Sequence, residues 1–282
     1  MNFKNLAIRS LSGIVYVGAI IGCILWGKVG MGLLCSLFAI GASYELEKQT
    51  LGKAEGSRWM LTWVLDAAIL VAMVWCSAMY LSFWGMPLFF AGIILFLFRF
   101  IWQIFIVQPK PLMSVAVSCL AILYIGFPLA LFASLSWILN LPWVLICAVA
   151  MIWINDSGAY LVGCTIGRNK MFPRLSPKKS WEGFIGGVVF NIAAAFIYFY
   201  CFDLKSSPFL SNVQGWIFIG IAVSAIATLG DLFESMLKRS LGIKDFGNII
   251  PGHGGILDRI DSLLFVVPGV SVFCFLGYLM FL

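Results

Sequence analysis

The chain has 282 residues, of which 62% are hydrophobic and only 11% are charged. Its mean hydropathy is +1.03, and apolar stretches recur from end to end, which excludes a soluble domain of this length. Basic loops beside anionic lipid headgroups explain the net charge of +6, so nucleic-acid binding is not indicated. The eight cysteines are widely spaced, and neither a zinc site nor a disulfide framework is suggested.

Apolar stretches of membrane-spanning length organise the whole chain. A helix needs about 20 apolar residues to cross the hydrocarbon layer, and continuous runs of Leu, Ile, Phe and Val lack the alternation of a β-barrel strand. We therefore predict an all-α, polytopic helical membrane protein, with residues 1–282 forming a single integral membrane domain. About nine transmembrane helices are expected, over residues 11–26, 29–46, 60–84, 86–107, 114–137, 141–162, 183–202, 214–234 and 260–282.

The distribution of Lys and Arg predicts which ends of these spans face the cytoplasm. Basic residues near span ends are retained on the cytoplasmic side, and all 18 Lys and Arg residues except Lys28 and Lys205 fall on one predicted face. We therefore expect the N-terminus and the two richest loops, 163–182 and 235–259, to be cytoplasmic. The predicted location is the cell (cytoplasmic) membrane, with the protein crossing it several times.

Charged residues inside an apolar span are costly, about 2.5 to 3.5 kcal/mol each, and usually face a partner or a cavity. Asp66 and Arg99 are isolated in the third and fourth spans, where a structural role is favoured and pairing with each other is one possibility. Asn155 and Asp156 lie near the cytoplasmic end of the sixth span, where glycines allow close backbone approach. For these two residues we favour a functional role.

The loop before the seventh span ends in the sequence SPKKSWEG, residues 176–183. Lys178 and Lys179 precede a predicted helix N-terminus, and Ser180 is a suitable N-cap. Ammonium groups together with the free N–H donors of a first helical turn form an anion site. An ordinary basic flank with a capping serine explains the same pattern equally well. The glycine pairs Gly18/Gly22 and Gly183/Gly187 are spaced for close helix packing.

Two pairs of acidic residues border the loop after the eighth span. Asp231 and Glu234 are three residues apart, and Asp258 and Asp261 repeat this spacing. Residues at i and i+3 share a helix face, so each pair has a simple structural explanation in the helix dipole, and Glu234 in an i,i+4 pair with Lys238. Two pairs converging on a basic loop instead indicate Mg²⁺-assisted chemistry on phosphates, because carboxylates bind the cation and basic residues bind phosphate oxygens.

The segment 235–261 resembles the signature of the phosphatidate cytidylyltransferases, also called CDP-diacylglycerol synthases. The similarity extends upstream through DSGAYLVG (residues 156–163) and SPKKSWEG, and covers the C-terminal half; the N-terminal half agrees only in hydropathy. The residues that carry it in the signature are Ser235, Leu237, Lys238, Arg239, Lys244, Asp245, Gly247, Ile250, Pro251, His253, Gly254, Gly255, Ile256, Asp258, Arg259 and Asp261.

This resemblance implies a reaction of CTP with phosphatidate, a membrane lipid, that gives CDP-diacylglycerol and pyrophosphate. It also implies a homodimer and Mg²⁺ as cofactor, with a second cation left open. Residues 138–282 would then form the catalytic half with a cytoplasm-facing polar cavity, and residues 1–137 a scaffold with dimer contacts. The expected catalytic and metal-binding residues are Asp231, Asp258 and Asp261. The expected substrate-binding residues are Asn155, Asp156, Ser176, Lys178, Lys179, Lys238, Arg239, Lys244, His253, Gly254, Gly255 and Arg259.

Two other functions fit parts of the same sequence. A kinase that uses CTP to phosphorylate a lipid or polyprenol alcohol would need similar carboxylates and basic residues. A polytopic transporter would account for charged residues within spans, although its polar residues are expected near the membrane midplane of repeated halves. Here the polar residues concentrate in the C-terminal half.

Overall fold

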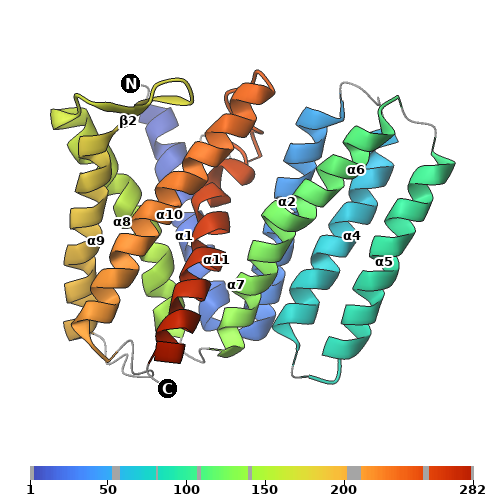
Figure 1. Ribbon diagram of the computed structural model, residues 1–282, viewed down its shortest axis with the longest axis horizontal. Coiled ribbons are helices and arrows are strands. Elements are labelled where there is room, and N and C mark those ends of the chain that lie inside the picture. The colour runs from blue at the N-terminus through green and yellow to red at the C-terminus, as the bar shows by residue number, and fades with distance from the viewer. Residues whose placement is uncertain are drawn as a thin grey trace. The chain divides into compact units, whose positions relative to one another are not determined.

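The computed structural model describes residues 3–52, 58–80, 82–106, 109–138, 142–201, 211–249 and 254–280, with side chains described from 12 to 136 and from 142 to 272 within these ranges. Helices dominate this part of the chain (Figure 1). The first group is α1 (Phe3–Leu25), α2 (Lys28–Thr50), α4 (Trp59–Ala78), α5 (Gly85–Phe105), α6 (Pro111–Leu120), the π-helical turn η2 (Ala121–Gly126) and α7 (Phe127–Ile138). The second group is α8 (Pro142–Ile166), β1 (Lys170–Phe172), β2 (Ser176–Ser180), α9 (Trp181–Cys201), α10 (Val213–Ser240) and α11 (Leu257–Met280).

The helices confirm the predicted fold class. Seven of them, within the described residues, are long and apolar enough to cross a membrane, the sequence from α6 to α7 counting as one. Every predicted span coincides with a helix, but several helices are longer than expected. The eighth span ends at residue 240 rather than 234, and the ninth begins at residue 257 rather than 260. The basic residues Lys238 and Arg239 therefore lie on a helix and not in a loop.

A short antiparallel hairpin replaces the loop expected after the sixth span. Strands β1 and β2 pair with Lys170 opposite Ser180 and Phe172 opposite Ser176. The hairpin leads directly into α9, where the Ser180 hydroxyl accepts a hydrogen bond from the Gly183 amide at 3.2 Å. This bond confirms the predicted N-cap, since it satisfies one of the free amides of the first turn.

The chain divides into two compact units. The first contains Met1–Pro142 together with Leu241–Ile260, and the second contains Trp143–Ser240 together with Asp261–Leu282. Helix α11 therefore begins in the first unit and continues in the second. The segment 241–260, although close to the C-terminus in sequence, belongs with the N-terminal helices. The expectation of one integral domain stays a prediction.

The first unit is organised around a buried ion pair. Arg99 on α5 donates to Asp66 on α4 at 3.1 Å, and the two side chains are 1% and 0% exposed. The remaining donors of the guanidinium reach Ser114 at 3.0 Å, Ser118 at 2.8 Å and Gln103 at 2.9 Å. The predicted pairing of Asp66 with Arg99 is confirmed, and the several partners of the guanidinium agree with the structural role favoured for both residues.

Glycines let α8 and α9 approach closely in the second unit. A Cβ atom at Gly183 would lie 2.8 Å from the Ala159 carbonyl oxygen, and one at Gly187 would collide with the Asn155 side chain. The predicted packing role of the Gly183/Gly187 pair is therefore confirmed. A Cβ at Gly18 or Gly22 would meet no atom within 4 Å in the part of the chain that the structure describes.

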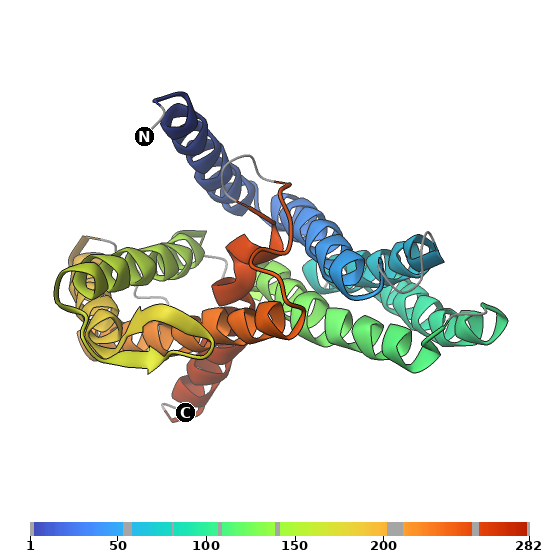
Figure 2. The ribbon, with the colours of Figure 1, turned by 90° about the horizontal axis from the view of Figure 1, so that it is seen from above.

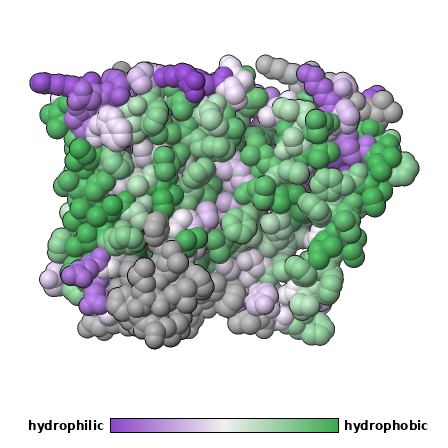
Figure 3. All heavy atoms as spheres, viewed as in Figure 1, coloured by the Kyte–Doolittle hydropathy of each residue, from purple (hydrophilic) through white to green (hydrophobic). Residues whose placement is uncertain are grey.

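Apolar side chains cover much of the outer surface of the helices. On α5, only Gly85 and Arg99 are buried, while Phe89, Ile94 and Ile104 are between 49% and 79% exposed. Such exposure is unfavourable in water but is expected where helices face lipid. Figure 3 shows hydrophilic residues gathered instead over the hairpin at one end of the second unit. The chain is a multi-pass membrane protein.

Candidate active site

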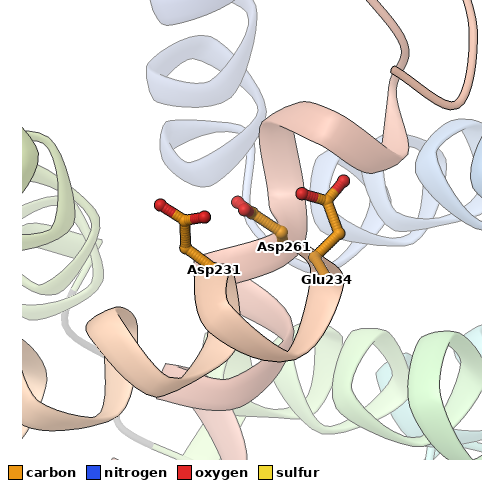
Figure 4. Close-up of side chains that lie close together, drawn as sticks. All are labelled: Asp231, Glu234 and Asp261. Carbon is orange, nitrogen blue, oxygen red and sulfur yellow. The ribbon is translucent and has the colours of Figure 1, made fainter. Parts of the chain in front are cut away.

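Three carboxylates meet in the second unit, where α11 lies against α10. Ligand oxygens of Asp231, Glu234 and Asp261 all lie within 4.8 Å of one another. Figure 4 shows the two α10 side chains and the α11 side chain directed to the same region. Glu234 is 1% exposed, whereas the two aspartates are partly exposed. The cluster is therefore open to a cation or a solvent-borne ligand at its aspartate side.

Close helix packing brings Asp261 to the other two carboxylates. A Cβ atom on Gly230 would lie 3.1 Å from the backbone oxygen of Asp261 and 3.1 Å from Phe265. The Ser262 hydroxyl donates to the carbonyl of Ala227 on α10 at 3.3 Å. Gly230 thus favours this close approach, because a side chain there would crowd the backbone of α11. Since Asp231 follows Gly230 directly, the contact point of the helices and the carboxylate cluster coincide.

Lys179 supplies a positive charge to the cluster from the hairpin. Its ammonium lies 2.8 Å from Asp231 and donates to the Thr228 carbonyl at 3.3 Å. Lys178, the next residue toward the N-terminus, is exposed. The sequence suggested that both lysines flank a helix start, but they belong to β2, where successive side chains point to opposite faces. The hairpin, yellow in Figure 2, thus directs one lysine of the pair to α10.

The end of α10 and the C-terminal half of α8 contribute further charged groups. Lys238 pairs with Glu234 at 2.5 Å, as the i,i+4 spacing predicted. Arg239 donates to the carbonyl of Leu175 in the hairpin turn at 3.4 Å. Asp156 on α8 interacts electrostatically with Asp261. Residues from α8, β2, α10 and α11 are therefore gathered around one cluster within the second unit.

Asn155 is buried between helices rather than exposed to solvent. Its side chain is 2% exposed, its amide nitrogen lies 3.3 Å from the Asp156 carboxylate, and its oxygen faces Gly187 of α9. Ser176 opens strand β2 and is partly exposed. The expected contact of these two residues with substrate stays a prediction.

The other predicted site residues belong to the first unit. The Asp258 carboxylate accepts hydrogen bonds from the backbone amides of Phe246 at 3.1 Å and Gly255 at 3.0 Å. Gly254 has a φ of 87°, a conformation that favours glycine. Within the described residues, the carboxylate cluster does not include Asp258, so its role as metal ligand stays a prediction. Lys244 and Arg259 are exposed, and His253 lies outside the described residues.

A comparison with protein-family profiles identifies the family of the chain. The profile of the cytidylyltransferase family matches residues 7–277. The chain belongs to this family. The match includes both the C-terminal segment and the N-terminal helices, for which the sequence had offered only agreement in hydropathy.

Individual relatives match a shorter region. A phosphatidate cytidylyltransferase of Haemophilus influenzae is 48% identical over 125 residues, which are 44% of this chain and 43% of the relative. Enzymes of the same name from Bacillus subtilis and Staphylococcus aureus (strain COL) are 47% and 42% identical over 121 and 127 residues. These matches cover 43% and 46% of the two relatives, so the chain aligns with slightly less than half of their length.

The donor set of the cluster fits a magnesium ion. Mg²⁺ prefers oxygen ligands at about 2.0 to 2.1 Å, which places neighbouring ligand oxygens about 3 Å apart and opposite ones about 4 Å apart. Asp231, Glu234 and Asp261 offer three such oxygens within 4.8 Å. Glu234 was not among the residues expected to bind metal, although its i,i+3 spacing from Asp231 was visible in the sequence.

Removal of the Lys179 charge is expected to strengthen cation binding at the cluster. The ammonium lies 2.8 Å from Asp231 and repels a cation bound there, so Lys179→Gln should lower the Mg²⁺ dissociation constant about tenfold, equivalent to about 1.4 kcal/mol. Titration calorimetry on the detergent-solubilised protein measures this change. Lys178→Gln provides the matched comparison because it removes the same charge from the opposite strand face. Equal effects of the two substitutions would contradict a specific role of Lys179.

Proposed function

We propose that this chain is a membrane nucleotidyltransferase that converts CTP and phosphatidate to CDP-diacylglycerol and pyrophosphate for phospholipid biosynthesis. The cluster of Asp231, Glu234 and Asp261 with Lys179 beside it carries this proposal. The family match over residues 7–277 supports it, as do the names of the bacterial relatives. Carboxylates beside basic groups suit a reaction between two phosphorylated substrates.

The chemistry requires charge neutralisation more than proton transfer. The phosphate of phosphatidate has a second pKa of about 6, so its attacking oxygen is already ionised near neutral pH. That oxygen forms a bond to the α-phosphorus of CTP. The bond between the α-phosphorus and the oxygen that bridges it to the β-phosphorus breaks, and pyrophosphate leaves. The protein must align the two anions and reduce their repulsion. Lys179 and Arg239 are suitably charged for this role on the hairpin side of α10.

The carboxylate cluster would hold the magnesium ion. When bound, Mg²⁺ would neutralise phosphate oxygens and stabilise the charge of the departing pyrophosphate. Asp231 and Asp261 are partly exposed and would present their oxygens to it, whereas the buried Glu234 is held in place by Lys238 at 2.5 Å. We also retain Asp258 as a proposed catalytic carboxylate on the strength of the signature it belongs to.

The membrane context supports access for both substrates. The basic loops predict that the hairpin and the segment 241–256 face the cytoplasm, where CTP is dissolved. Phosphatidate would reach the same level by lateral diffusion in the inner leaflet. We include a homodimer in the proposal, and the cell membrane as its location.

Labelled CTP tests the proposed reaction and separates it from the kinase alternative. Purified protein in phosphatidate-containing nanodiscs with Mg²⁺ should transfer label to lipid from α-labelled CTP but not from γ-labelled CTP. A CTP-dependent kinase gives the reverse pattern and releases CDP. No observation favours the transporter alternative. Of the charged residues that motivated it, Asp66 and Arg99 pair with each other, and Asp156 interacts with Asp261 of the carboxylate cluster. Absence of lipid product with folded protein would contradict the proposal.

A further inference from the structure

Helix α2 carries a stripe of residues that holds the signature segment in the first unit. Gly41, Glu45 and Gln49 are spaced four residues apart and therefore share one helix face. A Cβ at Gly41 would collide with the side chain of Ile256. One turn on, the Glu45 carboxylate accepts a hydrogen bond from the Leu257 amide at 2.9 Å. After another turn, the side-chain amide of Gln49 donates to the Phe246 carbonyl at 2.9 Å.

Glu45 is the central residue of this stripe. Its side chain is 2% exposed, although burial of a carboxylate is costly unless hydrogen bonds or charges compensate for it. Leu257 is the first residue of α11, and the first amides of a helix have no partner within the helix. Glu45 supplies such a partner from a position 212 residues away in sequence. The positive end of the α11 dipole in turn stabilises the buried charge.

The same carboxylate explains two glycines of the signature. A Cβ at Gly247 would collide with Glu45, and one at Gly255 would lie 2.5 Å from its Oε2 atom. The backbone at both glycines therefore approaches the Glu45 carboxylate more closely than any other residue type would allow. This observation links the glycine pattern of the segment to a residue on α2 that the sequence had not singled out.

The segment that α2 holds contains Asp258. Phe246 donates its amide to Asp258 at 3.1 Å and accepts from Gln49 through its carbonyl. Gly255 donates its amide to Asp258 at 3.0 Å, two residues before the amide that Glu45 binds. The orientation of Asp258 thus depends on backbone groups that α2 holds in place. Asp261 follows Asp258 one turn later on α11.

We propose that Glu45 is a positioning residue for catalysis, which fixes the described parts of the signature segment, residues 246–249 and 254–258, together with the first turn of α11, through its buried carboxylate. Glu45 contacts the backbone of this segment and acts through Asp258 rather than on a substrate. The kinetic part of this inference rests on the proposed nucleotidyltransferase activity. The structural part, that Glu45 restrains the segment, is independent of it.

Glu45→Gln is the informative substitution because it keeps the size of the side chain and one acceptor oxygen while it removes the charge. We expect amide hydrogen exchange in a peptide covering residues 244–258 to become at least tenfold faster, since the restraint that Glu45 places on this segment is weakened. The turnover number should fall about tenfold to a hundredfold, because small displacements of reacting groups reduce rates on this scale. The KM for CTP should change less than threefold.

Glu47→Gln is the matched control on the same helix. Glu47 is also a fully buried carboxylate, with 0% exposure, and its side chain hydrogen-bonds with Asp66 on α4. The Glu47→Gln substitution should lower the free energy of unfolding. The amide exchange rate in the peptide 244–258 and the turnover number should stay within threefold of the wild type. Equal effects of the two substitutions, or wild-type exchange in Glu45→Gln, would overturn the proposal.

A second variant covers the case in which Glu45→Gln fails to fold. Gln49→Leu removes only the hydrogen bond to the Phe246 carbonyl at the partly exposed end of the stripe. Gln49→Leu should accelerate amide hydrogen exchange around Phe246 about tenfold and reduce the turnover number severalfold. Unchanged exchange around Phe246 would contradict the proposed restraint by α2. If the wild type makes no CDP-diacylglycerol, the proposed function fails, whereas the exchange comparison still decides whether α2 restrains the segment.

Discussion

Asp261→Asn is expected to reduce formation of CDP-diacylglycerol about a hundredfold to a thousandfold. The substitution keeps the shape of the side chain but removes one of three carboxylates within 4.8 Å, and preorganised charges at a reaction centre contribute on this scale. A weaker cluster would also bind Mg²⁺ less tightly, so the metal dissociation constant should rise. Initial rates with α-labelled CTP, together with calorimetric Mg²⁺ titration, measure both effects.

The control for this experiment is Glu182→Gln, which makes the same chemical change in the same unit. Glu182 lies at the start of α9, is partly exposed, and accepts hydrogen bonds from Asn169 at 2.8 and 3.0 Å. Its replacement should leave the rate within threefold of the wild type. A rate for Asp261→Asn that equals the control rate, with unchanged Mg²⁺ affinity, would remove Asp261 from the active site. Size-exclusion chromatography of both variants verifies that assembly is retained.

Asp66→Leu is expected to destabilise the protein by about 3 to 5 kcal/mol. The substitution leaves the guanidinium of Arg99 without its carboxylate partner at a position that is 1% exposed, and an uncompensated buried charge costs this much. Ser118, which donates to Asp66 at 2.5 Å and to the Ser114 carbonyl at 3.1 Å, loses the first of these acceptors as well. The midpoint temperature of thermal unfolding in detergent, or the yield of folded protein from membranes, should decrease strongly.

The double variant Asp66→Leu, Arg99→Met separates the pair from simple loss of packing. Replacing both charges with apolar side chains of similar size is often close to neutral, so most of the lost stability should return. If the double variant is as unstable as the single one, the ion pair is not the cause. If Asp66→Leu alone unfolds like the wild type, the buried pair contributes nothing measurable.

The amino-acid sequence determined the fold class and the approximate limits of the spans. Hydrophobic runs of about 20 residues have few alternatives to membrane helices, because backbone polar groups in lipid must bond within the same segment. Local spacing also predicted the Ser180 cap and the pairing of Glu234 with Lys238, since both depend on residues three or four positions apart. The signature segment 235–261 indicated the family, which the match over residues 7–277 confirmed.

Only the tertiary structure decided which charges from distant parts of the sequence meet. Lys178 and Lys179 are equivalent in sequence, but strand pairing in the hairpin turns Lys179 to Asp231. Packing of α11 on α10 at Gly230 adds Asp261 to a cluster that includes the unexpected Glu234. Glu45 reaches Leu257 across 212 residues of sequence. Hydropathy and short spacings describe each helix alone, whereas these contacts depend on how helices pack, which no local pattern specifies.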